Sequence, residues 1–259
     1  RHGLSVKDAV REKELIDRDR KLIENADIES YYVQFLRKTI DLSCEYQSKL
    51  LNGMRVTYCG VEGAFAYMAA KRMFPEAELI PYSDFGDAYR AVERGEYDCV
   101  VLPLENSTAG SVNAVYDLMM RHNFRIVRSV RIKIDHNLLA NPGAKIEDIR
   151  EIYSHEQAIS QCAHFLQGLP NVKVIRCENT AVAARMVAES GRSDVAALSS
   201  RACMDLYGLE NLAASVQDQG NNYTRFICIA KDLEIYPGAD RTSLMMVLPH
   251  KPGSLYMVL

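Results

Sequence analysis

Apolar and polar residues follow a repeating order between residues 55 and 230, and this order predicts strands that alternate with helices. Short apolar runs predict strands at 55–59, 99–104, 126–134, 152–154, 172–176, 195–199 and 225–230. Segments with helical periodicity predict helices at 64–74, 85–94, 111–122, 156–166, 181–189 and 200–207. Such alternation favours an α/β fold with a mostly parallel sheet covered on both faces, and the length allows two lobes of this kind.

Two helices are predicted before this α/β region. Ser5 and Asp8 form a start signal similar to a capping box for a charged helix that runs to about residue 24. Asp27 or Ser30 can cap a second helix that runs to about residue 51. One face of the second helix carries Leu36, Ile40, Ser43, Gln47 and Leu50. This face is apolar except for a hydroxyl and an amide in its middle, which fits either imperfect packing or a polar site.

A further unit is predicted to begin after the α/β region. A strand is expected at 243–248, and residues 249–253 lead into a helix that starts at Ser254. Because the chain begins at Arg1 and stops at Leu259 inside an amphipathic segment, we expect it to be part of a longer protein.

The composition narrows the class of function. The 259 residues are 48% hydrophobic and 25% charged, which is typical of a soluble globular protein. The net charge of −3 comes from well-mixed residues without a basic block, so a small-molecule ligand is expected rather than nucleic acid. Seven scattered cysteines form no CxxC pair, which predicts no zinc site. Their odd number, with no signal peptide and no long apolar span, predicts free thiols and a cytoplasmic location.

Residues 222–226 carry the strongest single sign of chemistry. Thr224 and Arg225 place a hydroxyl beside a guanidinium where a loop becomes a strand, close to Asn222. The pair can offer one hydrogen bond or proton and one fixed positive charge to a small anion. The pattern therefore predicts part of an active site.

Further polar residues follow other predicted strands. They are Glu105, Asn106, Ser107 and Thr108 after one strand, Ser154 and His155 after another, Thr180 at a helix start, and Ser199 and Ser200 after a fourth strand. Ligands of open α/β sheets collect at this edge, although the same residue types are also preferred helix caps. Their number favours a shared cleft. Taken alone, His136 and His155 fit structural hydrogen bonding better than a base role, and Glu105 fits a surface carboxylate.

Several motifs, in one order, resemble those of prephenate dehydratase. They are Pro103-Leu104-Glu105-Asn106-Ser107 with Gly110, Ser154-His155-Glu156-Gln157 with Gln161-Cys162, Tyr207-Gly208-Leu209, and Asn222 to Phe226. The similarity covers about residues 55–232 and departs at Ala64 and Ala66, where the family often has hydroxyl residues. It implies two lobes like those of periplasmic binding proteins, with a cleft between them.

The resemblance also implies roles for single residues. Thr224 is implied as the principal catalytic residue, with Glu105, Asn106 and Gln161 beside it. Substrate-binding roles are implied for Arg225, Asn222, Ser107, Ser154, His155 and Thr180. The implied reaction is the decarboxylating dehydration of prephenate to phenylpyruvate in phenylalanine biosynthesis. This reaction needs no electron sink, so neither a metal nor another cofactor is implied.

Both ends of the chain resemble parts of other domains. Residues 5–51 are similar to the last two helices of an all-helical chorismate mutase, which isomerises chorismate to prephenate. The residues that match its site are Asp8, Arg11, Glu12, Ser43 and Gln47. The long first helix of that domain is missing from this sequence, so little mutase activity is expected. Residues 243–259 resemble the start of an ACT domain, which binds phenylalanine as a feedback inhibitor in that family.

The expected organisation follows from these resemblances. The expected parts are a partial mutase at 1–52, a dehydratase at 53–232 with lobe 1 at about 53–130 and 213–232 and lobe 2 at about 131–212, and an ACT start at 240–259. Family behaviour implies a homodimer. Two alternatives stay open: a two-lobed module that binds an amino-acid-like molecule without catalysis, and a helical interaction hairpin. A pure receptor has no use for a hydroxyl donor beside an arginine, which favours the enzyme.

Overall fold

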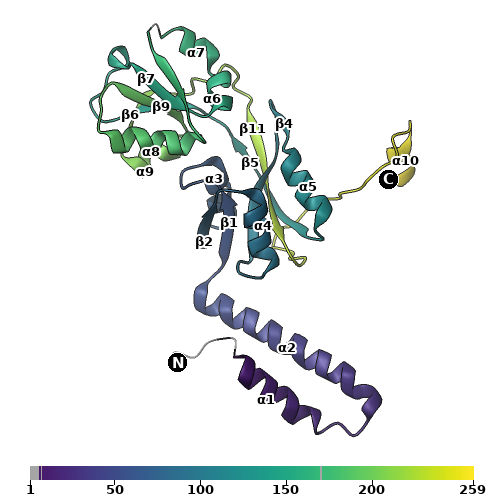
Figure 1. Cartoon of the computed structure of the whole chain (residues 1–259). Coiled ribbons are helices and arrows are strands. Elements are labelled where there is room, and N and C mark those ends of the chain that lie inside the picture. Colours follow the sequence, from purple (N-terminus) through teal and green to yellow (C-terminus); the bar gives the residue numbers. More distant parts are fainter. Residues whose placement is uncertain (1–5, 7, 170) are drawn as a thin grey trace.

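The computed structural model describes residue 6, residues 8–169 and residues 171–259. Three parts follow one another along the chain: a helical hairpin, an α/β body with two lobes, and a C-terminal segment (Figure 1). The hairpin lies below the α/β body in this view, and the C-terminal segment lies to its right. Within the described residues, no helix is both long and apolar enough to cross a membrane.

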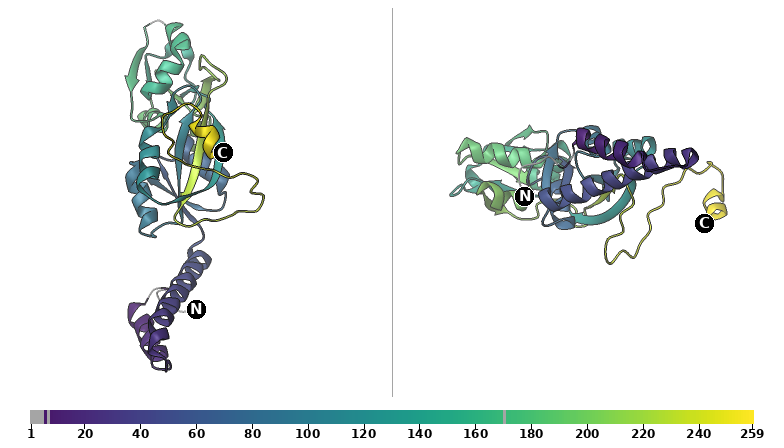
Figure 2. Two further views of the ribbon diagram at one scale, coloured as in Figure 1. Left: turned by 90° about the vertical axis from the view of Figure 1, so that its right-hand side faces the viewer. Right: turned by 90° about the horizontal axis from the view of Figure 1, so that it is seen from below.

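The hairpin pairs two antiparallel helices. They are α1 (Ala9–Arg20) and α2 (Ala26–Asn52). The Asp8 carboxylate accepts hydrogen bonds from the backbone N–H groups of Val10 (3.1 Å) and Arg11 (3.2 Å), so Asp8 is itself the N-cap and not the acidic third residue of a capping box. Ser5, the other predicted capping residue, lies outside the described residues. α1 ends earlier than predicted, and the left view of Figure 2 shows the hairpin projecting away from the α/β body.

Lobe 1 is built on a sheet with the strand order β2-β1-β3-β11-β5, and β4 pairs with β3. Its strands are β1 (Arg55–Cys59), β2 (Glu78–Tyr82), β3 (Cys99–Asn106), β4 (Gly110–Ser111), β5 (Arg125–Lys133) and β11 (Tyr223–Ala230). Its helices are α3 (Phe65–Met73) on one face and α4 (Phe85–Glu93) and α5 (Asn113–Arg121) on the other. The neighbours Val100 and Val101 belong to two different hydrophobic clusters, as expected for a strand that is buried on both faces.

Lobe 2 has a second sheet with the strand order β10-β6-β9-β7-β8. Its strands are β6 (Asn137–Ala140), β7 (Glu151–Ser154), β8 (Lys173–Arg176), β9 (Val195–Ser199) and β10 (Glu210–Ala213). Its helices are α6 (Glu156–Gln161), α7 (Ala163–Gln167), α8 (Thr180–Ser190) and α9 (Ala202–Tyr207), with a 3₁₀ turn η1 (Ile146–Asp148). Residues Leu138 and Leu139 again point into separate clusters, so this sheet is also covered on both faces.

Both sheets are mixed, whereas the alternation of elements predicted a mostly parallel arrangement. In lobe 1, β11 runs antiparallel to β3 and β5, because the chain re-enters this lobe from lobe 2. In lobe 2, β6 runs antiparallel to β9 and β10. The sequence prediction also omitted β2, β6 and β10, which are short strands of four or five residues. The predicted helix at 156–166 is two short helices that meet at Cys162.

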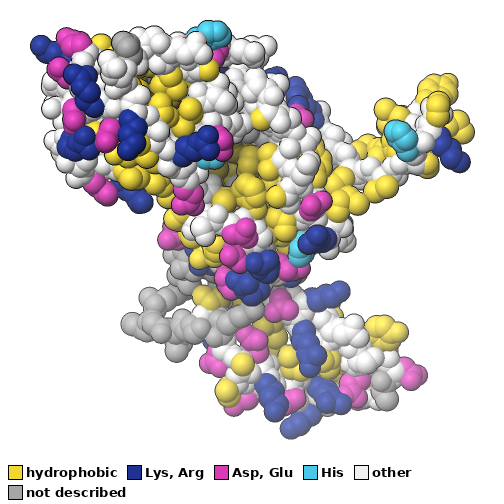
Figure 3. All heavy atoms as spheres, turned by 45° about the horizontal axis from the view of Figure 1, so that its top comes forward, with side chains coloured by type: hydrophobic (Ala, Val, Ile, Leu, Met, Phe, Trp, Pro, Cys, Tyr) yellow, Lys and Arg dark blue, Asp and Glu magenta, His cyan; other side chains and the backbone are white. Residues whose placement is uncertain are grey.

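The strand predicted at 243–248 is wrong. A strand needs a partner for its backbone N–H and C=O groups, and this segment extends from the α/β body with Leu244 and Val247 70% and 76% exposed. The helix expected at Ser254 is present as α10 (Ser254–Val258). Figure 3 shows hydrophobic side chains gathered around this C-terminal segment, while charged side chains of both signs are interspersed over the rest of the visible face.

Candidate active site

A cleft of about 670 Å³ lies between the two lobes. In lobe 1, its lining residues come from the end of β3, the start of β11 and the loops that follow β1 and β2. The others come from α6 and the start of α8 in lobe 2 and from the segment that joins β5 to β6. The predicted site residues in its lining are Asn106, Thr224, His155, Gln161 and Thr180. The expected convergence of these residues from distant parts of the sequence is therefore present.

Thr224 lies on β11 directly opposite Asn106 of β3 and is 8% exposed. The Asn106 Nδ2 atom donates a hydrogen bond to Thr224 Oγ1 over 2.9 Å. Because an amide nitrogen only donates, the threonine oxygen is the acceptor and the hydroxyl proton is left for another partner. The threonine hydroxyl can thus act as a hydrogen-bond donor in the cleft.

The Asn106 amide is held in one orientation. Its Oδ1 atom accepts hydrogen bonds from the backbone N–H groups of Thr108 (3.0 Å) and Ala109 (2.8 Å) and from the Thr108 hydroxyl (2.7 Å). Backbone N–H groups can only donate, so the atom facing them must be the amide oxygen. The nitrogen of Asn106 is therefore fixed on the side of Thr224.

Hydrogen bonds extend from Asn106 across to lobe 2. The Asn106 Nδ2 atom also donates to Asn222 Oδ1 (2.7 Å), and Asn222 Nδ2 donates to Gln161 Oε1 (2.9 Å). The Nε2 atom of His136 lies 3.0 Å from the same Gln161 oxygen. Asn222 and His136 are buried. Consecutive hydrogen bonds thus connect Asn106, Asn222, Gln161 and His136.

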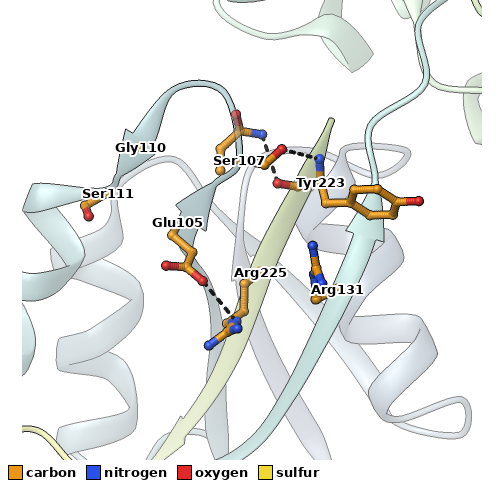
Figure 4. A pocket seen from close by; sticks show the side chains of 8 residues that line it. Glu105, Ser107, Gly110, Ser111, Arg131, Tyr223 and Arg225 are labelled. Atoms are coloured by element: carbon orange, nitrogen blue, oxygen red, sulfur yellow. Dashed lines mark hydrogen bonds and ion pairs between the residues drawn. The ribbon is translucent and has the colours of Figure 1, made fainter. Parts of the chain in front are cut away.

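Glu105 and Arg225 do not share the cleft with Thr224, contrary to the expectation. Successive side chains of a strand point to opposite faces of the sheet, so these two residues face away from Asn106 and Thr224. Their side chains form an ion pair of 3.1 Å in a second pocket of about 320 Å³ that also contains Ser107, as Figure 4 shows. The structure thus separates Glu105 and Arg225, which the resemblance implied as site residues, from the hydroxyl of Thr224.

Three further predicted site residues make hydrogen bonds within the protein: Ser107, Ser154 and His155. The Ser107 hydroxyl donates to the Asn221 carbonyl and accepts from the Tyr223 N–H, which braces the loop before β11. Ser154 is fully buried and donates to the Leu198 carbonyl over 2.8 Å, so it is used inside lobe 2. His155 caps α6 through Nδ1, which accepts from the Gln157 N–H.

The described lining of the cleft lacks the positive side-chain charge that was expected from Arg225. Among the described residues that line it, none is Arg or Lys, and Glu178 is the one carboxylate. The start of α3 at Ala64 and Phe65 lies in the lining, and no side chain caps this helix. Uncapped N–H groups at a helix start attract anions.

The loop between β1 and α3 is anchored on lobe 2. The Ser200 hydroxyl donates to the Gly63 carbonyl (3.0 Å), and the Tyr207 hydroxyl donates to the Glu62 carbonyl (3.0 Å). Val61 and Ala64 also pack against a hydrophobic cluster of lobe 2. A loop of lobe 1 is thus part of the packing of the other lobe.

The hairpin residues that match a mutase site lie on facing helices. Glu12 of α1 comes within 3.9 Å of the Cys44 thiol of α2, and Gln47 donates to the Ser43 hydroxyl over 3.0 Å. Asp8 is occupied as the cap of α1, and Arg11 is exposed.

Comparisons with known proteins find relatives of the α/β body. A family model described as prephenate dehydratase matches residues 56–234. Arogenate dehydratase/prephenate dehydratase 2 of Arabidopsis thaliana is 41% identical over 209 residues, which cover 80% of this chain and 54% of that protein. A bifunctional chorismate mutase/prephenate dehydratase of Neisseria gonorrhoeae is 35% identical over 208 residues, which cover 80% of this chain and 58% of that protein.

A solved structure is also similar. The prephenate dehydratase of Arthrobacter aurescens, solved in complex with L-Phe, matches with a TM-score of 0.66 at 28% identity and covers 78% of this chain and 70% of that chain. This chain spans about half the length of the curated plant relatives that it matches. Since the family model covers well over half of this chain, the chain belongs to the prephenate dehydratase family.

Proposed function

We propose that the chain converts prephenate to phenylpyruvate, with loss of carbon dioxide and water, in phenylalanine biosynthesis. Family membership supports the reaction, and the contact between Asn106 and Thr224 supports the assignment of the site. Thr224 Oγ1 accepts from Asn106 at 2.9 Å, so its own proton is available to a ligand in the cleft. This contact is the observation that carries the proposal.

The proposed chemistry follows from the groups that prephenate carries. Breaking the bond to the ring carboxylate sends its electron pair into the ring, which becomes aromatic as the ring hydroxyl departs. The departing oxygen needs a proton or a strong hydrogen bond. Thr224 supplies that donor, and a threonine hydroxyl is effective in this role because Asn106 already holds it in place.

The two carboxylates of prephenate need positive partners, which in this cleft are backbone N–H groups. The start of α3 is not capped by a side chain, and the start of α8 at Thr180 also lies in the lining, where Asn179 Oδ1 already accepts from the Val182 N–H and the earlier N–H groups of the helix remain for a ligand. Helix starts carry about half a positive charge each. We assign the substrate carboxylates to these two helix starts in place of Arg225.

Arogenate is a second candidate substrate, because the plant relatives are named arogenate dehydratases. It carries an ammonium group where prephenate has a keto group. Glu178 is the one carboxylate among the described lining residues and can face that ammonium. Competition between the two substrates in one assay decides the preference, and Glu178→Gln should weaken arogenate turnover selectively.

The other parts of the chain support a larger parent protein. We propose the division given above, with a partial mutase at 1–52 and an ACT start at 240–259 on either side of the dehydratase at 53–232. In the parent protein, the hairpin would contribute Glu12, Ser43 and Gln47 to chorismate isomerisation, and phenylalanine would act as the effector. A cytoplasmic homodimer remains part of this proposal.

The test is turnover of prephenate by the purified chain. Wild-type protein should form phenylpyruvate, and Thr224→Val should lower kcat by about 10²–10³, as expected for loss of a held donor. Thr224→Ser keeps the hydroxyl and should retain most of the rate. A two-lobed binding module without catalysis, the competing function, would bind prephenate and form no phenylpyruvate.

A further inference from the structure

One buried histidine of the cleft has no part in the reaction proposed above. His136 lies in the segment that joins the two lobes, lines the cleft and is 3% exposed. Its ring meets the ring of Phe65 edge to face, with the centroids 6.0 Å apart. Its backbone N–H donates to Gln217 Oε1 over 2.9 Å. Packing and hydrogen bonds therefore hold this ring in place.

The neighbours of the imidazole define which nitrogen carries the proton. Nε2 of His136 lies 3.0 Å from Gln161 Oε1, and that same oxygen accepts from Asn222 Nδ2. A carbonyl oxygen only accepts, so Nε2 must be the N–H donor. Nδ1 is buried and has no hydrogen-bond partner among the described residues. A neutral ring with its proton on Nε2 fits both nitrogens.

Burial disfavours a second proton on the His136 ring more than the nearby charges favour it. Burial lowers the pKa of His136, while the hydrogen bond to the amide and the charge of Asp135 act in the opposite direction. Asp135 is itself paired with Lys133 over 2.9 Å. The other titratable groups in the cleft lining include His155 and Glu178. Protonation would place a second N–H where the described residues offer no acceptor.

We propose that His136 is a positioning residue: its Nε2–H fixes the Gln161 amide and, through Asn222, adds a second constraint on the Asn106 amide that the loop N–H groups already orient beside the catalytic hydroxyl. This inference rests on the proposed dehydratase function. Without the histidine donor, the Gln161 amide is held only by the hydrogen bond from Asn222 to its Oε1 and by the longer contact of 3.4 Å from its Nε2 to Thr108 Oγ1, so its position is less constrained. Asn222 then loses its fixed partner, although it also accepts from Asn106.

The first test does not depend on turnover. The full chain is labelled with ¹⁵N histidine, and the ring nitrogens of His136 are followed by NMR from about pH 8 to pH 5. We expect a neutral ring with the proton on Nε2 near neutral pH, and a titration midpoint below the ordinary value of 6.5. A proton on Nδ1, or a cationic ring near neutral pH, would overturn the proposal.

The second test compares two substitutions. His136→Gln can place an amide N–H close to the position of Nε2, whereas His136→Phe keeps the ring shape and removes the donor. We expect His136→Phe to lower kcat about tenfold with little change in KM, and His136→Gln to recover to within about threefold of wild type. His164→Gln, at a histidine with an 85% exposed side chain, is the matched control.

The pH profile separates positioning from simple packing. Protonation keeps the Nε2–H but adds an N–H on Nδ1, which has no acceptor among the described residues and should displace the ring; wild-type kcat should therefore fall on the acid side, and His136→Gln should lack this fall. Equal rates for His136→Phe and wild type, or no recovery in a stable His136→Gln, would refute the proposal. A wild-type chain that does not turn over prephenate would refute the proposed function instead, and the ring tautomer would still decide the arrangement around His136.

Discussion

Asn106→Asp is expected to disable the site by reversing one hydrogen bond. The carboxylate can still accept from the N–H groups of Thr108 and Ala109, which now lie 3.0 and 2.8 Å from Oδ1. The other oxygen would replace Nδ2, which donates to Thr224 Oγ1 at 2.9 Å and to Asn222 Oδ1 at 2.7 Å. The Thr224 hydroxyl would then donate its proton to the new carboxylate and not to the substrate.

The expected loss has two parts. Removal of a preorganised donor costs about 2.7–4 kcal/mol in the transition state, which corresponds to about 10²–10³ in kcat. The Asn222 oxygen would also lose its donor and face another oxygen, which costs about 1–3 kcal/mol of the free energy of unfolding. We therefore expect a folded protein of reduced stability with almost no turnover.

The assay measures phenylpyruvate formed from prephenate, together with urea unfolding of the same samples. Asn221→Asp makes the same chemical change at an exposed neighbouring position and is the matched control. Because Asn106 acts through Thr224, the double variant Asn106→Asp/Thr224→Val should be no slower than Thr224→Val alone. Turnover by Asn106→Asp within about threefold of wild type, or losses that multiply in the double variant, would refute the reasoning.

Four further outcomes are expected. Gly63→Ala should destabilise the fold by about 1–3 kcal/mol in urea unfolding, since φ is +86° and a Cβ would lie 2.8 Å from Cys203 Sγ; an unchanged midpoint would contradict the anchoring of this loop. Arg225→Ala should keep kcat within about threefold of wild type, because its half-exposed ion pair with Glu105 lies in the other pocket; a loss as large as that of Thr224→Val would return Arg225 to the site. Burial raises the pKa of Cys59 to about 11, with the charges of Asp84 and Glu178 adding to it, so alkylation of this thiol should stay slow until pH approaches that value; fast labelling near pH 8, read by mass spectrometry, would disagree. The pKa of His136 is lower in the folded chain than in the unfolded chain, so the unfolded chain binds the proton first as the pH falls. The contribution of His136 to the free energy of unfolding should therefore be complete above pH 6.5 and should decline as the pH falls below 6.5. His136→Gln should flatten that decline in urea titrations.

Strands that lie in the buried middle of a sheet could be predicted closely from the sequence. The predicted limits of β1 and β9 coincide with the observed Arg55–Cys59 and Val195–Ser199. β9 is a short apolar run that follows Asp194, and β1 is a run of mostly strand-forming residues that ends before Gly60. β10 contains Glu210 and Asn211 in four residues, so no apolar pattern identifies it. Its place in the sheet depends on pairing with β6, which no local pattern encodes.

Several residues that line the cleft were predictable, but the face of the sheet on which each one lies was not. The predicted strands ended at Leu104 and began at Arg225, which left Glu105, Asn106 and Thr224 in loops where any side-chain direction is open. The observed strands extend to Asn106 and back to Tyr223, so alternation applies and divides these residues between two pockets. A difference of two residues at each strand end therefore decided which groups meet.

The role assigned to His136 depends on contacts that only the fold creates. Its partners Gln161 and Gln217 lie 25 and 81 positions away in the sequence. A lone histidine near the end of a strand gives no sign of such neighbours, and the sequence therefore favoured a structural reading.

The anchoring of the β1–α3 loop limits how the lobes can move. The loop belongs to lobe 1 by sequence, yet Gly63 and Glu62 are hydrogen-bonded to Ser200 and Tyr207 of lobe 2. Two segments join the lobes, residues 134–136 and residues 214–222. If the cleft opened by a hinge motion at these segments, the two hydrogen bonds would break or the chain would bend near Gly60, whose φ is +119°. These bonds between the loop and lobe 2 favour substrate entry by local displacement of residues at the edge of the cleft over a large rotation of one lobe relative to the other.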